Sequence, residues 1–374
     1  MKFFGRYLNS ALSVEAKQKD DIVKRAEAAL LTEPPHITDS SSPDSAGGRH
    51  DYFSQADYSW RNPDTPDGLP FVNRDGESYP GAFFEHRKAL RSMRSGTANL
   101  TAAYLFTRDA KYAKAAVRWL KEFFLDRETM MNPHLLYGQA VLGVCTGRGI
   151  GIIDTIHLMD VPVAADILFE NGQMDKDIYD GLKGWFAEYL NWICTHKYGL
   201  DEMNTKNNHT VCWHAQAAVF AKFTGNCDVL QMCADNYKNI ILPNQMAQDG
   251  SFPLELRRTK PYCYAIFVID NMATLCYILS TAENNLWEFT LPDGRGIKKG
   301  LDYLYPYLYN KSSWTYKDDI AYHDEWPVAM SFMLFAAAAY GEDKWLELYD
   351  ALPKYSANDE VRRNTAIRVP YLWL

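Results

Sequence analysis

Three features that would assign this chain of 374 residues to a large class of proteins are missing from its sequence. No stretch approaches the roughly 20 consecutive apolar residues of a membrane-spanning helix, so we expect no membrane span. Positive charge is not in excess, because the net charge is −8, and this argues against a general nucleic-acid binder. No segment shows sustained alternation of apolar and polar residues, which argues against a protein built from β-strands.

Cysteine is also scarce. The seven cysteines are an odd number scattered through apolar segments, so they do not form a disulfide framework. No two of them lie in a CxxC pair, which argues against a thiolate zinc site.

Aromatic residues, by contrast, are abundant. The chain contains 24 Tyr, 18 Phe and 10 Trp, and 47% of its residues are hydrophobic. This is ample for a large core, and we expect most aromatic rings to fill it, although such rings also stack on the faces of sugars. The length alone allows one large domain or two.

From residue 82 almost to the end, apolar residues recur at the three- and four-residue spacing of helices. The predicted helices cover about 82–106, 110–126, 139–156, 175–197, 208–223, 228–243, 262–281, 296–308, 325–340 and 343–350. An amphipathic helix is also expected over 13–31. Residues 32–81 are rich in Pro, Gly, Asp and Ser and are interrupted by aromatic residues, so we expect an ordered lid or cleft wall there.

One sequence pattern recurs in the helical part. A helix of small residues ends in an aromatic residue and a short polar turn, and another helix follows. It occurs at 102–109, 217–226 and 336–343. Small residues let helices approach closely, and short turns make neighbours antiparallel. Hairpins that stack and close form an all-α fold, an (α/α) toroid, which we predict as a single domain over 1–374. An open helical solenoid is the alternative, because the pattern does not show closure.

The segment Asn207-Asn208-His209 opens one of these helices. Asn is a strong N-cap, so we expect His209 in the first turn. The positive helix end would lower the pKa of His209 and keep a neutral base. Trp213 follows one turn later on the same face, where it could wall a sugar site. The alternative is that Asn208 only caps the helix and that His209 packs in the core.

A second motif covers residues 253–264. Pro261 suits the first position of a helix, which puts Tyr264 in the first turn and Arg258 in the preceding loop. The helix start and the guanidinium would both stabilise the phenolate of Tyr264, so this residue could donate a proton or, once ionised, accept one. The alternative is that Arg258 pairs with Glu255 and that Tyr264 belongs to the core.

A third polar stretch runs from Asn132-Pro133-His134 through Tyr137 and Gln139 to a glycine-rich turn at Arg148. It lacks the GxGxxG spacing and the preceding strand of a dinucleotide loop, so we interpret it as part of an oligosaccharide-binding surface.

Two other charged segments are expected to be structural. The basic cluster at 87–94 is interpreted as a solvated helix face. His323-Asp324-Glu325 is interpreted as a cap or a substrate contact, because three consecutive residues do not all face one metal ion on a helix.

Together, Asn208, His209, Arg258 and Tyr264 supply an amide, an imidazole, a guanidinium and a phenol. Such a set can neutralise a sugar carboxylate, remove the proton beside it and protonate a departing glycosidic oxygen. No metal or organic cofactor is needed. If these groups meet in space, they suit β-elimination in a 1,4-linked uronic-acid polymer.

On these motifs the chain resembles the α/α-toroid alginate lyases, and most closely polysaccharide lyase family 38, from about residue 51 to the C-terminal segment. The resemblance implies endo-acting, cofactor-free cleavage of alginate or glucuronan, an anionic polysaccharide. Tyr264 would be the catalytic acid and for some substrates also the base, His209 the partner base, and Asn208 and Arg258 the groups that neutralise the carboxylate. The substrate contacts that it implies are Asn207, Tyr58, Trp60, Tyr137, Gln139 and Arg148.

Two further expectations accompany this resemblance. The histidine that follows the catalytic tyrosine in the classical mannuronate-specific lyases is Ala265 here, so we do not expect a pure mannuronate specificity. The N-terminal residues lack a sustained apolar signal region, so we expect a periplasmic or secreted protein whose signal is not part of this sequence, or else a cytoplasmic one. The oligomeric state is left open.

Two other functions stay as alternatives. An inverting glycoside hydrolase on the same toroid needs two carboxyl groups about 6.5–9.5 Å apart, and Asp51, Asp154, Glu255 and Asp324 are available without forming a recognisable pair. A non-catalytic sugar-binding protein would bind uronate oligomers and leave their length unchanged.

Overall fold

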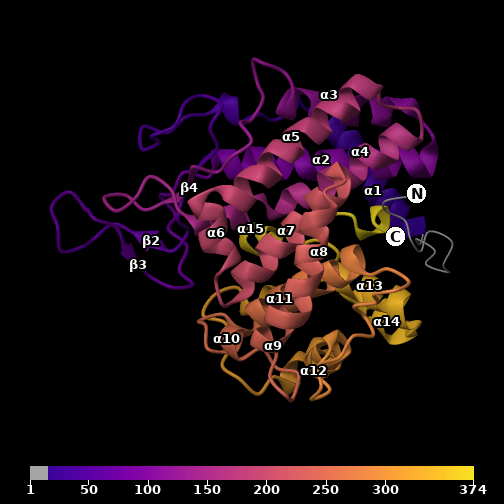
Figure 1. Cartoon of the computed structure of the whole chain (residues 1–374). Helices are drawn as coiled ribbons and strands as arrows, with labels where there is room; N and C mark the ends of the chain where they lie inside the picture. The colour runs from indigo at the N-terminus through magenta and orange to yellow at the C-terminus, as the bar shows by residue number, and fades with distance from the viewer. Residues whose placement is uncertain (1–15) are drawn as a thin grey trace.

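Helices make up most of the part of the chain that the computed structural model describes, residues 16–374 (Figure 1). The α-helices are α1 Ala16–Leu30, α2 Glu85–Thr107, α3 Ala110–Phe124, α4 Asp160–Glu170, α5 Lys176–Thr195, α6 Lys197–Met203, α7 Asn208–Thr224, α8 Cys227–Asn236, α9 Leu242–Gln245, α10 Pro253–Leu256, α11 Pro261–Leu279, α12 Ile297–Tyr309, α13 Ser331–Tyr340, α14 Asp343–Ala351 and α15 Asp359–Arg363. A π-helical turn, Tyr237–Ile241, joins α8 to α9.

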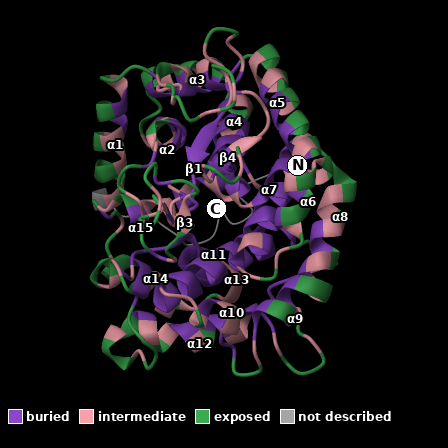
Figure 2. Cartoon of the chain, turned by 90° about the vertical axis from the view of Figure 1, so that its left-hand side faces the viewer, coloured by how far each residue is buried: buried purple, intermediate pink, exposed green. Residues whose placement is uncertain are grey.

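The helices form a ring of two layers. Figure 2 shows α7, α11 and α13 largely buried in the middle of the molecule, whereas α3, α5, α8, α12 and α14 lie around them and expose one side. Outer and inner helices pack as neighbours in the chain: α1 on α2, α7 on α8 and α13 on α14, while α11 packs on both α7 and α13. The fold is therefore the predicted single-domain (α/α) toroid.

The three predicted hairpin turns end their first helices in the same way. The residue after the helix adopts a left-handed conformation in each case: Arg108 after α2 (φ 61°), Gly225 after α7 (φ 78°) and Gly341 after α13 (φ 64°). A left-handed residue satisfies the last helical carbonyl and turns the chain away from the helix axis. The next helix then begins within three residues, so the two helices become antiparallel neighbours.

The C-terminal segment closes the ring against the first helices. Trp373 donates from its indole nitrogen to Asp160 of α4 at 2.9 Å, and Arg91 of α2 pairs with Asp359 of α15 at 2.9 Å. Gln18 of α1 donates to Asp350 of α14 at 2.8 Å. These contacts join residues more than 200 positions apart, and the open solenoid is excluded.

One predicted helix, 139–156, is wrong. Its start is a short strand, β4 Tyr137–Ala140, which pairs in parallel with β1 Phe53–Gln55, and its end is a 3-10 helix, η2 Gly149–Met159. The glycines between them explain the error, because a Cβ on Gly147 would lie 2.0 Å from the Leu136 carbonyl oxygen. The chain there is too tightly folded for a helix with side chains.

Smaller deviations occur elsewhere. The helix expected from 325 begins only at Ser331, since Pro327 disfavours helical conformation at the residue before it. The helices α4, α6, α10 and α15 were not predicted. The helix expected over 13–31 is α1, of which residues 13–15 lie outside the described residues.

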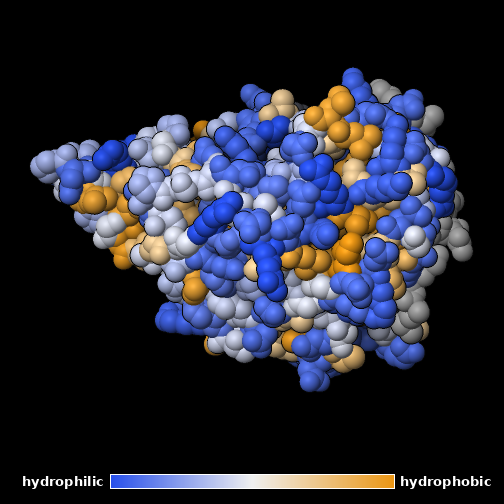
Figure 3. Space-filling model, turned by 90° about the horizontal axis from the view of Figure 1, so that it is seen from above, coloured by the Kyte–Doolittle hydropathy of each residue, from blue (hydrophilic) through white to orange (hydrophobic). Residues whose placement is uncertain are grey.

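Residues 32–81 have little regular structure. They contain a 3-10 turn at Ile37–Asp39, the strand β1, and the antiparallel pair of β2 Ser59–Trp60 and β3 Val72–Asn73. The part that carries β2 and β3 projects from the helical ring, as the narrow left-hand end of the molecule shows in Figures 1 and 3. This loop region stands beside the open end of the toroid and contributes to the cavity described below.

The helix α11 runs through the core. Every residue from Pro261 to Leu279 is buried. Within the described residues, α11 is the one helix long and apolar enough to cross a membrane, and its complete burial is that of a core helix. Its N-terminus is fixed by Asp319, whose carboxylate accepts hydrogen bonds from the backbone nitrogens of Tyr262 and Cys263 at 2.8 and 3.0 Å.

Candidate active site

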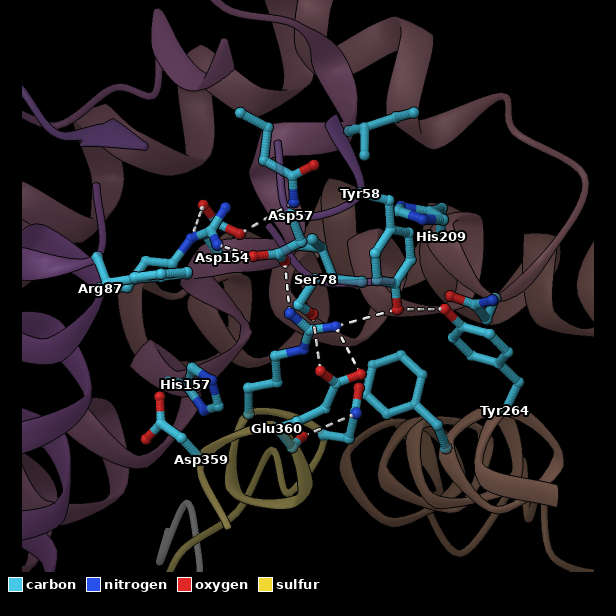
Figure 4. A pocket seen from close by; sticks show the side chains of 18 of the residues that line it. Asp57, Tyr58, Ser78, Arg87, Asp154, His157, His209, Tyr264, Asp359 and Glu360 are labelled. Carbon is cyan, nitrogen blue, oxygen red and sulfur yellow. Dashed lines mark hydrogen bonds and ion pairs between the residues drawn. The ribbon is translucent and has the colours of Figure 1, made fainter. Parts of the chain in front are cut away.

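One cavity collects most of the predicted chemistry. It has a volume of about 590 Å³ and is lined by residues of the loop region, α2, η2, α15 and the starts of α7 and α11 (Figure 4). Seven of the residues predicted from the sequence line it: Tyr58, Gln139, Arg148, Asn208, His209, Arg258 and Tyr264. The two motifs, about 50 residues apart in the chain, therefore face the same space.

Tyr264 lies in the first turn of α11, as predicted from Pro261. Its hydroxyl lies 2.8 Å from the Tyr58 hydroxyl and accepts a hydrogen bond from Nη2 of Arg258 at 3.2 Å. Burial raises the pKa of Tyr264 well above its ordinary value, the neighbouring Tyr58 adds to this, and the charge of Arg258 offsets only part of it. Arg258 therefore stabilises the phenolate as expected, but burial outweighs this effect and Tyr264 holds its proton in the free protein.

Arg258 is held between the loop region and Tyr264. Its Nη2 donates to Asp75 at 2.8 Å, and its guanidinium lies 4.2 Å from the centre of the Tyr264 ring. The alternative pairing with Glu255 is not formed, because Asp75 takes that place. Burial lowers the pKa of Arg258, but the hydrogen bond to Asp75 and the nearby acidic groups outweigh it and the net change is upward. The guanidinium therefore remains charged.

Asn208 is fixed by Glu255, a buried residue of α10. The Glu255 carboxylate accepts from the backbone nitrogen of Asn208 at 2.8 Å and from its side-chain nitrogen at 2.7 Å. Because both bonds use Asn208 donors, the amide nitrogen is turned toward Glu255. Burial raises the pKa of Glu255, and the two hydrogen bonds from Asn208 oppose that change. The cap of α7 is Asn207, whose side chain accepts from the backbone nitrogen of His209.

His209 lies in the first turn of α7, but its pKa moves opposite to the prediction. Its Nδ1 is 2.6 Å from a carboxylate oxygen of Glu202 in α6, and its side chain is 16% exposed. Burial lowers the pKa of His209, yet the charge of Glu202 and its hydrogen bond outweigh burial, so the net pKa is raised. The Glu202 carboxylate therefore has a larger effect on the pKa of His209 than the helix end does.

Gln139 and Arg148 meet at the rim of the cavity that lies beside η2. Arg148 donates to the Gln139 side-chain oxygen at 3.2 Å, and Gln139 donates to Asp154 at 3.1 Å. Asp154 also accepts from Tyr52, Ser54 and Arg87. Gln139 has a left-handed backbone (φ 50°).

A chain of ion pairs in the cavity was not predicted. Arg87 bridges Asp154 and Asp57, and Arg363 of α15 joins Asp57 at 2.8 Å to the Tyr58 hydroxyl at 3.0 Å. Burial raises the pKa of Asp57, but Arg363 and Arg87 outweigh it and the pKa is lowered. Figure 4 shows this chain running from Arg87 to Tyr264.

The interpretation of 87–94 as a solvated face is therefore wrong for two of its arginines. Arg87 and Arg94 are buried, and each pairs with an aspartate. The clustering of basic residues at 87–94 was the only sequence signal for this network. Arg363 has no comparable signal, since it belongs to a helix of only five residues.

Four predicted contact residues do not line the cavity: Asn207, Trp60, Tyr137 and Trp213. Trp213 is fully buried in the core, which contradicts its predicted place in the wall of a sugar site. Trp60 lies in β2, where the guanidinium of Arg74 is 4.7 Å from its ring centre. Asn207 acts as the cap of α7.

The carboxylates that line the cavity are all ion-paired. They are Asp57, Asp75, Asp154, Asp359 and Glu360. Of the four acids considered for a hydrolase, only Asp154 lines the cavity, and it is bound by four donors. Among residues 16–374, no group of three or more His, Cys, Asp or Glu side chains is placed to hold a metal ion.

Comparisons with known proteins show which folds and which family the chain is similar to. A crystal structure of an alginate lyase from Bacteroides ovatus matches with a TM-score of 0.84 and 29% identity, over 98% of this chain and 99% of that one. Alginate lyase A1-III from Sphingomonas species A1 matches with a TM-score of 0.53 and 14% identity over 88% of each chain. A histidine-to-alanine variant of A1-III complexed with a tetrasaccharide matches with a TM-score of 0.55 and 12% identity, over 93% of this chain and 92% of that one.

The two A1-III structures show a shared fold alone, given their low identity. A search of curated proteins finds no significant match. The family model described as alginate lyase matches residues 36–314, which is well over half of the chain. The protein belongs to the alginate lyase family.

Proposed function

We propose that this protein is a polysaccharide lyase that cleaves alginate, and also glucuronan, by β-elimination and leaves 4,5-unsaturated uronate ends. The observation that carries the proposal is that a protonated phenol, a charged guanidinium, an amide and an imidazole line one cavity. The match to a Bacteroides ovatus protein that is named an alginate lyase supports it.

The reaction requires stabilisation of negative charge at the substrate carboxylate. The C5 proton of a uronate is weakly acidic, so its removal builds an enolate-like dianion. Arg258 supplies a positive charge at this point, and Asn208 supplies a fixed amide. Hydrogen bonds fix Arg258 to Asp75 and Asn208 to Glu255. The two side chains therefore do not need to move during the reaction.

Tyr264 is the proposed acid. Its raised pKa means that it carries a proton to the C4 oxygen as the glycosidic bond breaks. Mannuronate and glucuronate differ only at C2, and in both the C5 proton and C4 oxygen leave from one side. For these substrates Tyr264 first loses its own proton to solvent; its phenolate, stabilised by Arg258, then takes the C5 proton and gives it to the C4 oxygen as the glycosidic bond breaks, which restores the phenolate.

Guluronate has the opposite configuration at C5, so its elimination is anti and needs a base on the other side from Tyr264. His209 is the proposed base there. It acts in its neutral form, and its hydrogen bond to Glu202 fixes Nδ1 and leaves Nε2 as the nitrogen that accepts the proton. Guluronate cleavage should therefore depend on His209 more than mannuronate cleavage does.

The test is a panel of polymannuronate, polyguluronate and glucuronan treated with wild type and with Tyr264→Phe. Wild type should generate the ultraviolet absorbance of unsaturated ends, and Tyr264→Phe should abolish it. Tyr309→Phe, at a side chain 74% exposed and remote from the cavity lining, is the matched control.

Three results would contradict the proposal. Normal turnover by Tyr264→Phe would exclude the mechanism. New reducing ends without unsaturation would indicate the hydrolase. Binding of uronate oligomers with no change in their length would indicate a non-catalytic sugar-binding protein.

A further inference from the structure

A second cavity lies next to the cavity that contains Tyr264 and His209, which is called the catalytic cavity from here on. It has a volume of about 550 Å³ and is formed by α1, α2 and the segment 354–368, which includes α15. Lys88, Arg91 and Asp359 line both cavities. The side chains of α15 divide between them: Arg363 faces the catalytic cavity and Arg362 the second one. The two cavities thus share part of their walls.

The second cavity is strongly basic. Its cationic lining residues are Arg25, Lys88, Arg91, Arg94, Lys354, Arg362 and Arg368, and Asp359 is the one carboxylate among the lining residues. That carboxylate is already bound by Arg91 and Arg362, at 2.9 and 2.7 Å. Within the described part of the chain, Arg25, Lys88 and Arg368 form no ion pair, so the cavity carries uncompensated positive charge.

The side chain of Arg94 independently indicates that the second cavity binds an anion. Its side chain is only 3% exposed, and its terminal nitrogens contact His157 at 2.7 Å and Asp160 at 3.4 Å. The Nε atom is buried and has no hydrogen-bond partner. A buried donor without an acceptor is costly, and an anion in the cavity that Arg94 lines would provide one.

Tyr355 makes cation–π contacts with Arg25 and Arg368, which form no ion pair within the described residues. The guanidinium groups of Arg25 and Arg368 lie 4.1 and 4.6 Å from the centre of its ring. Their attraction to the ring keeps two positive groups together despite their mutual repulsion. Burial, followed by the charges of Arg25 and Arg94, lowers the pKa of Arg368 to about 10, so a bound anion would relieve this repulsion.

We propose that this basic pocket, defined by Arg25, Lys88, Arg94 and Arg368, binds carboxylates of a uronate chain that continues beyond the catalytic cavity. A polyuronate carries one carboxylate on each sugar, so a chain leaving the catalytic cavity across Lys88 and Arg91 meets further cations in the pocket. The inference rests on the proposed function for the identity of the polymer. The pocket would hold long substrates and leave the cleavage step to the catalytic cavity.

The test compares Arg25→Gln/Arg368→Gln with wild type, both carrying Tyr264→Phe so that bound oligomers stay intact. Affinities for a polymannuronate dodecamer and for a tetramer are measured by calorimetry. The dodecamer should bind about tenfold more weakly to the pocket variant, as expected for the loss of charge-assisted contacts, while the tetramer binds within about twofold. Arg49→Gln/Arg127→Gln removes the same charge from exposed positions outside both cavities and should leave both affinities unchanged.

Equal dodecamer affinity in the pocket variant and the control would overturn the inference. So would a pocket that binds inorganic phosphate while the substitutions leave the dodecamer affinity unchanged, since the site would then serve a small anion. Turnover by the protein with Tyr264 intact is scored separately by ultraviolet absorbance. Its absence would overturn the proposed lyase function, whereas the binding result stands or falls independently.

Discussion

The hydroxyl of Tyr58 lies 2.8 Å from the hydroxyl of Tyr264. This contact joins the loop region to the start of α11 across the catalytic cavity, over 206 positions of the sequence. Tyr58 in turn accepts a hydrogen bond from Arg363 at 3.0 Å. The proposed acid is therefore positioned from both sides, by Arg258 on one and by Tyr58 on the other.

We expect Tyr58→Phe to lower kcat about tenfold, because one hydrogen bond that aligns the Tyr264 hydroxyl is lost, a change of about 1.4 kcal/mol. Steady-state kinetics on polymannuronate measures it. Tyr309→Phe, an exposed Tyr, should behave as wild type. A kcat within a factor of about two of wild type would show that Tyr58 does not position Tyr264.

Glu202→Gln should change the pH dependence of guluronate cleavage. Glu202 raises the pKa of His209, so removing its charge lets His209 lose its proton at a lower pH. The acidic limb of kcat/KM should then shift by about one pH unit to lower pH if neutral His209 is the base. Asp201→Asn, an exposed change of equal charge in the same helix, is the control.

The pairing of Glu202 with His209 also predicts how the free energy of unfolding changes with pH. The folded pKa of His209 is raised, so its pairing with Glu202 stabilises the fold fully below the unfolded pKa of about 6.5. That contribution is lost as the pH rises through the folded value. Denaturant unfolding of Glu202→Gln should therefore show a deficit that is larger at pH 5.5 than at pH 9; an equal deficit at both would contradict this account.

Glu255→Gln should lower kcat about tenfold to a hundredfold and destabilise the fold by about 1–3 kcal/mol. A Gln at this place can accept only one of the two Asn208 hydrogen bonds, and its own amide nitrogen would oppose the other donor. Kinetics of Glu255→Gln, Asn208→Ala and the double variant measure the coupling. Additive effects would show that Glu255 does not act through Asn208.

Arg258→Lys should lower kcat/KM about a hundredfold. Lysine has a single nitrogen, which cannot reproduce the two-nitrogen contact of Arg258 with Asp75, through Nε at 3.4 Å and Nη2 at 2.8 Å, while it also reaches Tyr264. Arg257→Lys changes the exposed neighbour in the same way and should leave the kinetics unchanged. A variant of Arg258 with near-normal kcat/KM would mean that one positive charge suffices.

Gly151→Ala should destabilise the protein by about 1–3 kcal/mol, because the new Cβ would lie 2.5 Å from the Gly138 carbonyl oxygen. The matched control is Gly184→Ala in α5, where nothing lies within 4 Å of the added atom. That change should raise stability by about 1 kcal/mol, since Ala favours a helix interior over Gly. Thermal unfolding of both variants measures the two opposite effects.

The sequence pattern was sufficient to predict those parts of the site that local rules govern. Pro261 and the asparagines before His209 placed Tyr264 and His209 in first helical turns, and the structure agrees, with Asn207 as the cap of α7. The toroid followed from three similar hairpins. These features depend on residues within a few positions of one another, which is the range over which helix caps and periodicity act.

The electrostatic partners could not be predicted in this way. Glu202, Asp75 and Glu255 reach His209, Arg258 and Asn208 from other helices or from the loop region. Glu202 reverses the pKa change that the helix end predicted for His209, and Asp75 takes the place that the alternative interpretation gave to Glu255. Such pairs are created by tertiary folding, and no spacing rule in one sequence identifies them.

The complete burial of α11 makes the two walls of the catalytic cavity unequal in their freedom to move. Tyr264 belongs to a helix enclosed on all sides, whose tilt would disturb packing along its whole length. Tyr58 stands on a segment that projects from the ring with little regular structure around it. We expect the segment that carries Tyr58 to move when a polymer enters the catalytic cavity. Tyr264 would stay in place, and each sugar would be positioned relative to it.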